Sequence, residues 1–177
     1  VYTFITVDLA VSKKQTADYT VLMVLQVDAD GNIYAVDMRR GRFTPVETIQ
    51  HLFELQQRWE PFDVGVEAVA FQKSMIYFIQ DKMRETGNYF PLRELKADKD
   101  KIRRAKAFQP YVLQGMFHVY KPISEPIIDE LISFPYAKHD DIVDAISYVL
   151  QIMRKPPKKR RKHTVTVHEP QNAITGY

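Results

Sequence analysis

Three β-rich runs open the chain, and no helix-length segment separates them. They cover residues 1–9, 20–27 and 33–38, and each is rich in β-branched and aromatic side chains. A polar segment joins the first two runs, and a sequence typical of a turn, residues 28–32, joins the second to the third. Because short connections join antiparallel neighbours, the three runs predict a β-meander.

Helix and strand patterns alternate after these runs. A capping box at Thr44 and Glu47, with Pro45 at the first helical position, predicts a helix that ends near Trp59. We further expect strands over 63–69 and 92–95, helices over 71–85, 100–114, 126–134 and 141–153, and a short extended piece over 117–120. This order predicts an α/β fold, a mixed five-stranded sheet flanked by helices, with the ribonuclease H-like topology.

The length and composition indicate one packed domain. The chain has 177 residues, of which 45% are hydrophobic, and this is enough for one core. We expect the domain to span residues 1–155 and to be followed by a basic tail over 156–177, flexible or folded as a late hairpin. The chain opens directly in a strand, which suggests a domain taken from a longer protein.

The composition also excludes several classes of site. Without cysteine, the chain has no disulfide and no thiolate zinc site, which fits a reducing cytosol. No apolar run approaches the roughly 18 residues that a membrane span needs, so we expect no membrane partner.

Positive charge is concentrated in two segments, although the net charge is only +3. Residues 96–106 and residues 155–162 each contain six lysines and arginines. Such clusters suit a polyanion, but they are also common on ordinary solvated surfaces. We therefore leave two roles open for Lys101, Arg103 and Arg104: contact with DNA phosphates, or solvation of their helix.

Acidic residues stand at three places in apolar sequence. Asp8 ends the first strand, Glu67 lies inside a later one, and Asp141 opens the last helix with Asp144 one turn further on. A carboxylate beside a core is costly unless it is paired or binds a metal. All-oxygen ligands favour Mg²⁺ or Mn²⁺. Two such ions can activate a water and stabilise the leaving oxygen in phosphodiester hydrolysis.

Each of these acids also has a structural interpretation. Asp8 could cap a turn, Glu67 could pair with a buried basic side chain, and Asp140 or Asp141 could cap the last helix.

The helical periodicity ranks the acids of the last helix as ligands. Asp141 lies at the edge of the apolar face, whereas Asp144 and then Asp140 lie further round, so we rank them in that order. His139, just before this helix, is an auxiliary candidate that could transfer a proton or hold a phosphate, or it could be structural.

Taken together, these segments resemble the C-terminal nuclease domain of large terminase subunits from tailed phages. The resemblance covers Phe4 to Met153. It is carried by Val7-Asp8, Ala17-Asp18-Tyr19-Thr20, Val66-Glu67, the Lys-x-x-Arg helix from Lys101 that ends at Gly115 and, most specifically, His139-Asp140-Asp141-Ile142-Val143-Asp144-Ala145.

The resemblance implies a function and a set of partners. Two Mg²⁺ or Mn²⁺ ions would be held by Asp8, Glu67 and Asp141, with Asp144 as an additional ligand, and the domain would cut concatemeric double-stranded DNA during genome packaging. An ATPase domain of the same longer chain, the small terminase subunit and the portal would be its partners in the host cell cytoplasm. This chain contains no Gly-rich phosphate loop, so we do not expect it to hydrolyse ATP.

Two other functions remain open at this point. The same acids would serve another ribonuclease H-like nuclease, such as a Holliday-junction resolvase or a transposase core, because fold and metal site do not define the substrate. A non-catalytic DNA-binding module could use the basic clusters alone. Metal dependence would separate that module from both nucleases.

Overall fold

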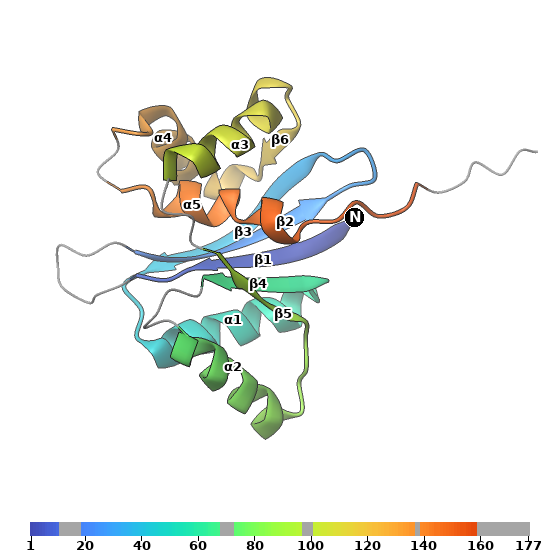
Figure 1. The fold of residues 1–177 in the computed structure, drawn as a ribbon, viewed down its shortest axis with the longest axis vertical. Coiled ribbons are helices and arrows are strands. Elements are labelled where there is room, and N and C mark those ends of the chain that lie inside the picture. The colour runs from blue at the N-terminus through green and yellow to red at the C-terminus, as the bar shows by residue number, and fades with distance from the viewer. Residues whose placement is uncertain (11–18, 68–72, 97–100, 137–138, 159–177) are drawn as a thin grey trace, which may run out of the picture.

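A computed structural model describes residues 1–10, 19–67, 73–96, 101–136 and 139–158 (Figure 1). Its strands are β1 (Tyr2–Asp8), β2 (Thr20–Val27), β3 (Ile33–Gly41), β4 (Asp63–Glu67), β5 (Leu92–Leu95) and β6 (Phe117–Val119). Its helices are α1 (Pro45–Trp59), α2 (Lys73–Thr86), α3 (Lys101–Leu113), the 3-10 turn η1 (Lys121–Ile123), α4 (Ser124–Ser133), α5 (Asp141–Ser147) and α6 (Val149–Ile152).

The strands form one mixed sheet in the order β5-β4-β1-β2-β3-β6. β1, β2 and β3 make the predicted antiparallel meander, and β4 and β5 continue the sheet in parallel from β1. The predicted α/β class and mixed sheet are confirmed, but the predicted count of five strands was wrong. The short piece after α3 becomes a sixth strand because β6 pairs in parallel with the start of β3.

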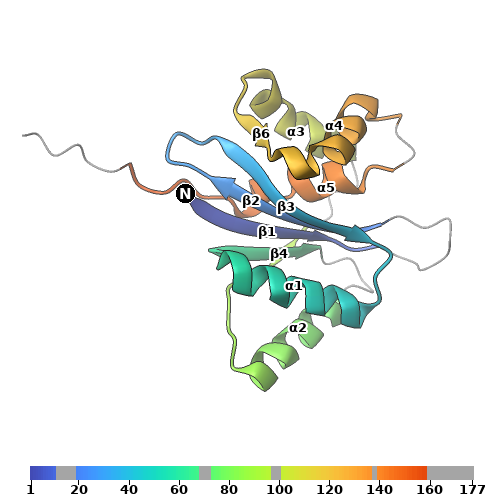
Figure 2. The same ribbon diagram turned by 180° about the vertical axis from the view of Figure 1, so that it is seen from behind.

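Helices cover both faces of this sheet. α1 and α2 lie on one face, whereas α3, α4 and α5 lie on the other (Figures 1 and 2). Side chains alternate along β1, so Ile5 enters the core under α1 and α2 while Phe4 enters the core under α5. Thr6 shares the face of Phe4 and donates a hydrogen bond of 2.6 Å to the carbonyl of Ala145 in α5. Asp8 lies two residues after Thr6 and so on the same face of β1, which directs its carboxyl group toward α5 as well.

The capping box that opens α1 is confirmed. The Thr44 hydroxyl accepts a hydrogen bond from the Glu47 amide, and the Glu47 carboxylate accepts one from the Thr44 amide.

The last helical segment is shorter and more buried than its pattern predicted. Instead of one helix over 141–153, the chain forms α5 and α6 with a break at Tyr148. All residues of α5 are buried, since α3 and α4 pack against it in addition to the sheet. The helical periodicity set Asp144 apart from the apolar face, yet Asp144 is as buried as Asp141.

Several sequence-based predictions fall partly or wholly on residues outside the described ranges. These are Asp18, all but the first residue of the polar connection over 10–17, the end of the strand over 63–69, the first residues of the helices over 71–85 and 100–114, and most of the basic tail, residues 159–177. Among the helices that are described, none is long and apolar enough to cross a membrane.

Asp28 organises the turn between β2 and β3. One of its carboxylate oxygens accepts hydrogen bonds from the backbone amides of Asp30, Gly31 and Asn32. The other accepts from the Asn32 side chain and from the Tyr34 hydroxyl. These bonds, the one from the Asn32 side chain above all, hold the pKa of Asp28 well below its usual range.

We expect Asp28→Asn to lower the melting temperature by a few degrees at pH 7. Because the folded-state pKa is depressed, the stabilisation is present above the unfolded-state pKa of about 3.9 and is lost as the pH falls through the lower folded-state value. Thermal melts between pH 7 and pH 2 should therefore show a difference that shrinks below about pH 4. Asp30→Asn is the control, since Asp30 is exposed and its carboxylate forms a surface ion pair with Lys158. A difference that is constant with pH would contradict a role of the carboxylate charge.

Candidate active site

Asp8 and Glu67 lie together because their strands are parallel neighbours. Each acid is the last residue of its strand, and parallel strands bring their carboxyl ends to the same edge of a sheet. The two side chains share a hydrogen bond. Burial, followed by this bond and by the negative charges of Glu67, Asp144 and Asp141, raises the pKa of Asp8 well above its usual range. Asp8 is therefore a buried carboxyl group surrounded by other acids.

Asp144 is paired with two cations of α3. Arg104 donates a hydrogen bond to one of its carboxylate oxygens, and the Lys101 ammonium lies 3.3 Å from the other. Burial raises the pKa of Asp144 even though both cations act in the opposite direction. Lys101 also contacts Asp140 at 2.8 Å. Although burial alone would lower it, the hydrogen bond with Asp140 and the charge of Asp144 raise the pKa of Lys101 above its usual range.

The structure thus separates the three basic residues predicted to contact DNA. Lys101 and Arg104 neutralise acids of the cluster, whereas Arg103 lies on the exposed side of the same helix.

Asp141 contacts a different part of the molecule, the segment around the end of β3. Its Oδ2 atom accepts a hydrogen bond of 3.1 Å from the backbone amide of Tyr19 and lies 3.9 Å from the guanidinium of Arg40. His139, the predicted auxiliary residue, has its Nδ1 atom 4.0 Å from the same oxygen, and its ring meets the Tyr19 ring edge-on. Asp141 and Asp144 therefore belong to one helix but have different partners.

Glu130, in α4, caps α5, and sequence reasoning did not identify it. Its Oε1 atom accepts hydrogen bonds from the backbone amides of Ile142, at 2.6 Å, and Val143, at 3.0 Å. Its Oε2 atom accepts one from Arg40. Burial raises the pKa of Glu130 to about 7, against the opposing effects of the Val143 amide and Arg40. Asp140 stands at the N-cap position but its side chain makes no capping hydrogen bond, so a capping role for Asp140 is wrong.

Tyr148 is the second residue that the sequence did not single out. Its hydroxyl donates a hydrogen bond of 2.8 Å to Glu67, and the guanidinium of Arg104 stacks on its ring. Burial and the charge of Glu67 raise the pKa of this hydroxyl, so it remains a donor. Both residues had a feature in the sequence that could have identified them.

Glu130 is a charged residue three positions after Ile127, on the buried face of α4. Tyr148 is a hydroxyl-bearing residue within an apolar run.

The carboxylates of this cluster are chemically suited to Mg²⁺ or Mn²⁺, because hard cations prefer oxygen ligands. Within the described ranges, no group of three or more His, Cys, Asp or Glu side chains is gathered closely enough to hold an ion as it stands. The negative charge is balanced instead by the raised pKa of Asp8 and by Lys101 and Arg104 beside Asp144. The donors therefore fit a divalent cation, and binding it would require Asp144 to loosen its ion pairs.

Residues 5–152 match the family described as the terminase RNaseH-like domain. The chain belongs to this family. The resemblance predicted from the motifs is thereby confirmed, over nearly the same span of the chain. No curated protein matches the sequence of this terminase domain.

Solved structures of low identity share the fold of the terminase domain. The yeast mitochondrial Holliday junction resolvase Ydc2 has a TM-score of 0.52 and 13% identity, covering 82% of this chain and 76% of that one. The fowlpox virus Holliday junction resolvase has a TM-score of 0.50 and 16% identity, covering 84% and 95%. At such identities the likeness concerns the fold alone, and it confirms the predicted ribonuclease H-like architecture.

We expect Glu130→Ala to loosen the start of α5 in the terminase domain. Two buried amides lose their acceptor, which costs about 1–3 kcal/mol. Hydrogen exchange at Ile142 and Val143 should become faster, and the melting temperature should fall. Asp129→Ala, an exposed change on the same helix, is the matched control and should alter neither quantity. Unchanged exchange in Glu130→Ala would show that α5 does not depend on this cap.

Proposed function

We propose that this terminase domain is a metal-dependent endonuclease that cuts concatemeric double-stranded DNA during packaging of a tailed-phage genome. The observation that carries the proposal is the gathering of Asp8, Glu67, Asp141 and Asp144 where β1 and β4 end under α5. A buried acidic cluster of this kind has no use in a module that only binds DNA. It is suited to phosphodiester hydrolysis once divalent cations neutralise it.

Asp8, Glu67 and Asp141 would hold two Mg²⁺ or Mn²⁺ ions, with Asp144 as an additional ligand. When bound, these ions would supply an activated water and charge neutralisation at the leaving oxygen.

The other residues of the site keep these ligands in place. Tyr148 orients Glu67 through its hydroxyl, and Glu130 orients Asp141 by holding the first amides of α5. Arg104 and Lys101 balance the charge of Asp144 while no cation is bound. A ligand held by a second side chain loses less conformational freedom when an ion binds.

We place this domain, residues 1–155, in a larger machine because its family is that of terminases. The partners we propose are double-stranded DNA, an ATPase domain of the same longer chain, the small terminase subunit and the portal, in the cytoplasm of the host cell. The fowlpox virus resolvase, which shares the fold, was solved with Holliday junction DNA, and this supports DNA as the polymer that such a site takes.

Plasmid cleavage should require Mg²⁺ or Mn²⁺. Purified protein should nick and then linearise supercoiled plasmid when either ion is present, and excess EDTA should abolish the reaction because no ion is then present to activate the water or to neutralise the leaving oxygen. Agarose electrophoresis of time courses measures both products. Cleavage that persists in excess chelator would rule out the metal mechanism.

The same assay separates this proposal from a resolvase function. A labelled four-way junction and a linear duplex of the same composition serve as competing substrates. A terminase nuclease should cut the duplex at a comparable rate, whereas strong preference for the junction would favour a resolvase.

Asp8→Asn and Asp141→Asn should each lower the initial nicking rate by about a hundredfold or more, since loss of an ion removes several kcal/mol of transition-state stabilisation. Both variants should remain folded, because removal of one charge relieves repulsion within the cluster. Asp144→Asn should be milder than Asp141→Asn, since Asp144 is already neutralised by α3. Asp81→Asn, an exposed acid of α2, is the matched control and should cut like the wild type. The reverse order of Asp141→Asn and Asp144→Asn would overturn our ranking of the ligands.

A further inference from the structure

Arg42 differs from three other cations near the acidic cluster. Lys101, Arg104 and Arg40 each contact at least one carboxylate. Arg42 is exposed, and no acidic partner lies within ion-pair distance of it in the part of the chain that the structure describes. Its guanidinium instead stacks on the ring of Tyr19, 4.6 Å from the ring centre. The positive charge of Arg42 is therefore held in place, and no acid among the described residues neutralises it.

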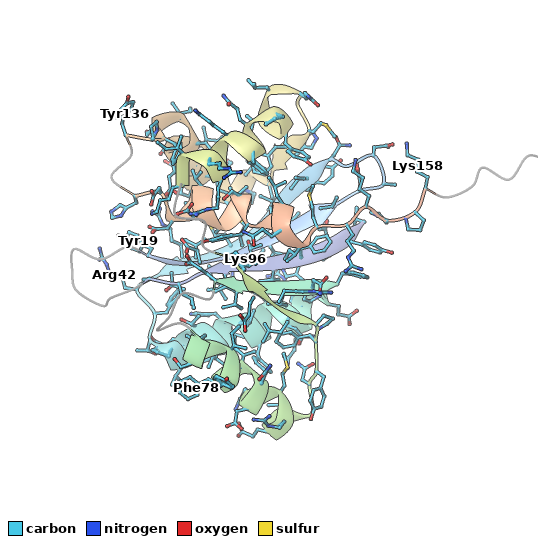
Figure 3. The ribbon with its side chains drawn as sticks, viewed as in Figure 1. Tyr19, Arg42, Phe78, Lys96, Tyr136 and Lys158 are labelled. Atoms are coloured by element: carbon cyan, nitrogen blue, oxygen red, sulfur yellow. The ribbon has the colours of Figure 1, made fainter. Side chains whose placement is uncertain are left out.

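Tyr19 links Arg42 to the acidic cluster. Its backbone amide donates to Asp141, and its ring lies 5.0 Å from the ring of His139 in an edge-on arrangement. Figure 3 shows Tyr19 and Arg42 next to each other on the left side of the molecule, whereas Lys158 lies on the right side. The Nδ1 atom of His139 is buried and has no hydrogen-bond partner among the described residues. Tyr19 therefore contacts both Arg42 and the proposed metal ligand Asp141.

An acidic cluster by itself repels DNA, so a nuclease site needs unpaired positive charge close by to hold the substrate. Lys101 and Arg104, on the Asp144 side, are already engaged with acids. On the Asp141 side, a stacked guanidinium keeps its N–H groups free for hydrogen bonds in the plane of the group, the geometry that suits phosphate oxygens. Because stacking has already restricted the Arg42 side chain, binding costs it less conformational entropy.

We propose that Arg42, which lies over the Tyr19 ring, binds a DNA backbone phosphate beside the acidic cluster. This inference rests on the proposed nuclease function and adds to it the side from which DNA enters the site. The DNA strand enters the site along the end of β3, next to Asp141, rather than along α3. The contact is to the backbone and is independent of base sequence.

The test measures binding of a labelled DNA duplex to the protein in EDTA, at a series of salt concentrations, by fluorescence anisotropy. Arg42→Gln should weaken binding about fivefold at low salt and reduce the slope of log affinity against log salt by about 0.9, the value for one lost phosphate contact. Arg42→Lys should fall between Arg42→Gln and the wild type, since it retains the charge but stacks less well. Two duplexes of unrelated sequence should give the same changes.

Arg154 offers a matched control. It is also exposed and lies over an aromatic ring, that of Phe62, which precedes β4 and so marks the end of the sheet away from Glu67. Arg154→Gln removes the same charge and should change the affinity less than Arg42→Gln. Equal effects of the two variants would overturn the phosphate site, because Arg42 would then act only through the net charge of the protein.

Plasmid cleavage by the wild type keeps this inference distinct from the nuclease proposal. Cleavage together with equal effects of Arg42→Gln and Arg154→Gln overturns the phosphate site alone. Weakened binding by Arg42→Gln in a protein that never cuts would overturn the nuclease and support the phosphate site. A wild-type protein that does not bind DNA at any salt concentration overturns the phosphate site directly.

Discussion

Helix α5 is held in place by a few buried hydrogen bonds to β1 and α4, and the acidic cluster depends on them. The Thr6 hydroxyl, on the sheet, donates a hydrogen bond to the Ala145 carbonyl. The Glu130 carboxylate, on α4, accepts hydrogen bonds from amides in the first turn of α5. Since α5 is buried on every side, it cannot rotate without exposing apolar surface or breaking one of these bonds. The positions of Asp141 and Asp144 relative to Asp8 follow from this packing.

This arrangement places like charges together, and the protein balances them in three ways. Asp8 responds through a raised pKa and a hydrogen bond with Glu67. Asp144 is neutralised by Lys101 and Arg104, and Asp141 accepts a backbone hydrogen bond and lies near Arg40. Each of these arrangements neutralises part of the negative charge, either with a positive side chain or with a proton. Divalent cations would otherwise have to neutralise it. With its charge balanced in this way, the site still offers oxygen donors to a divalent cation.

The two acids of α5 also face different surroundings, so the two sides of the site differ in the positive charge that they offer to DNA. Asp144 faces Lys101 and Arg104 of α3, both of which contact acids, whereas Asp141 faces the end of β3 with its stacked arginines. A polyanion is attracted most strongly where positive charge is not already paired. The face around Tyr19 therefore suits the approach of DNA better than the surroundings of Lys101 and Arg104 do.

Much of the site was predictable because it rests on local pattern. The alternation along β1 put Asp8 on a defined face, and the parallel order of β1 and β4 brought Glu67 to the same edge. Other features were not visible in this way. Helical periodicity could not show that α3 and α4 would bury the outer side of α5, and the residues 117–119 were too short to be recognised as a strand without β3 beside them.

The sequence by itself therefore determined the α/β class, the meander, the family and which acids form the cluster, because each depends on local periodicity or on short motifs. Only the tertiary structure decided the partners of those acids. The Thr6–Ala145 bond joins residues 139 positions apart, and the Tyr148–Glu67 bond joins residues 81 positions apart. No local pattern specifies such pairs, since they arise only when helices that are distant in the chain pack on the same face of the sheet and their buried polar groups must find partners there.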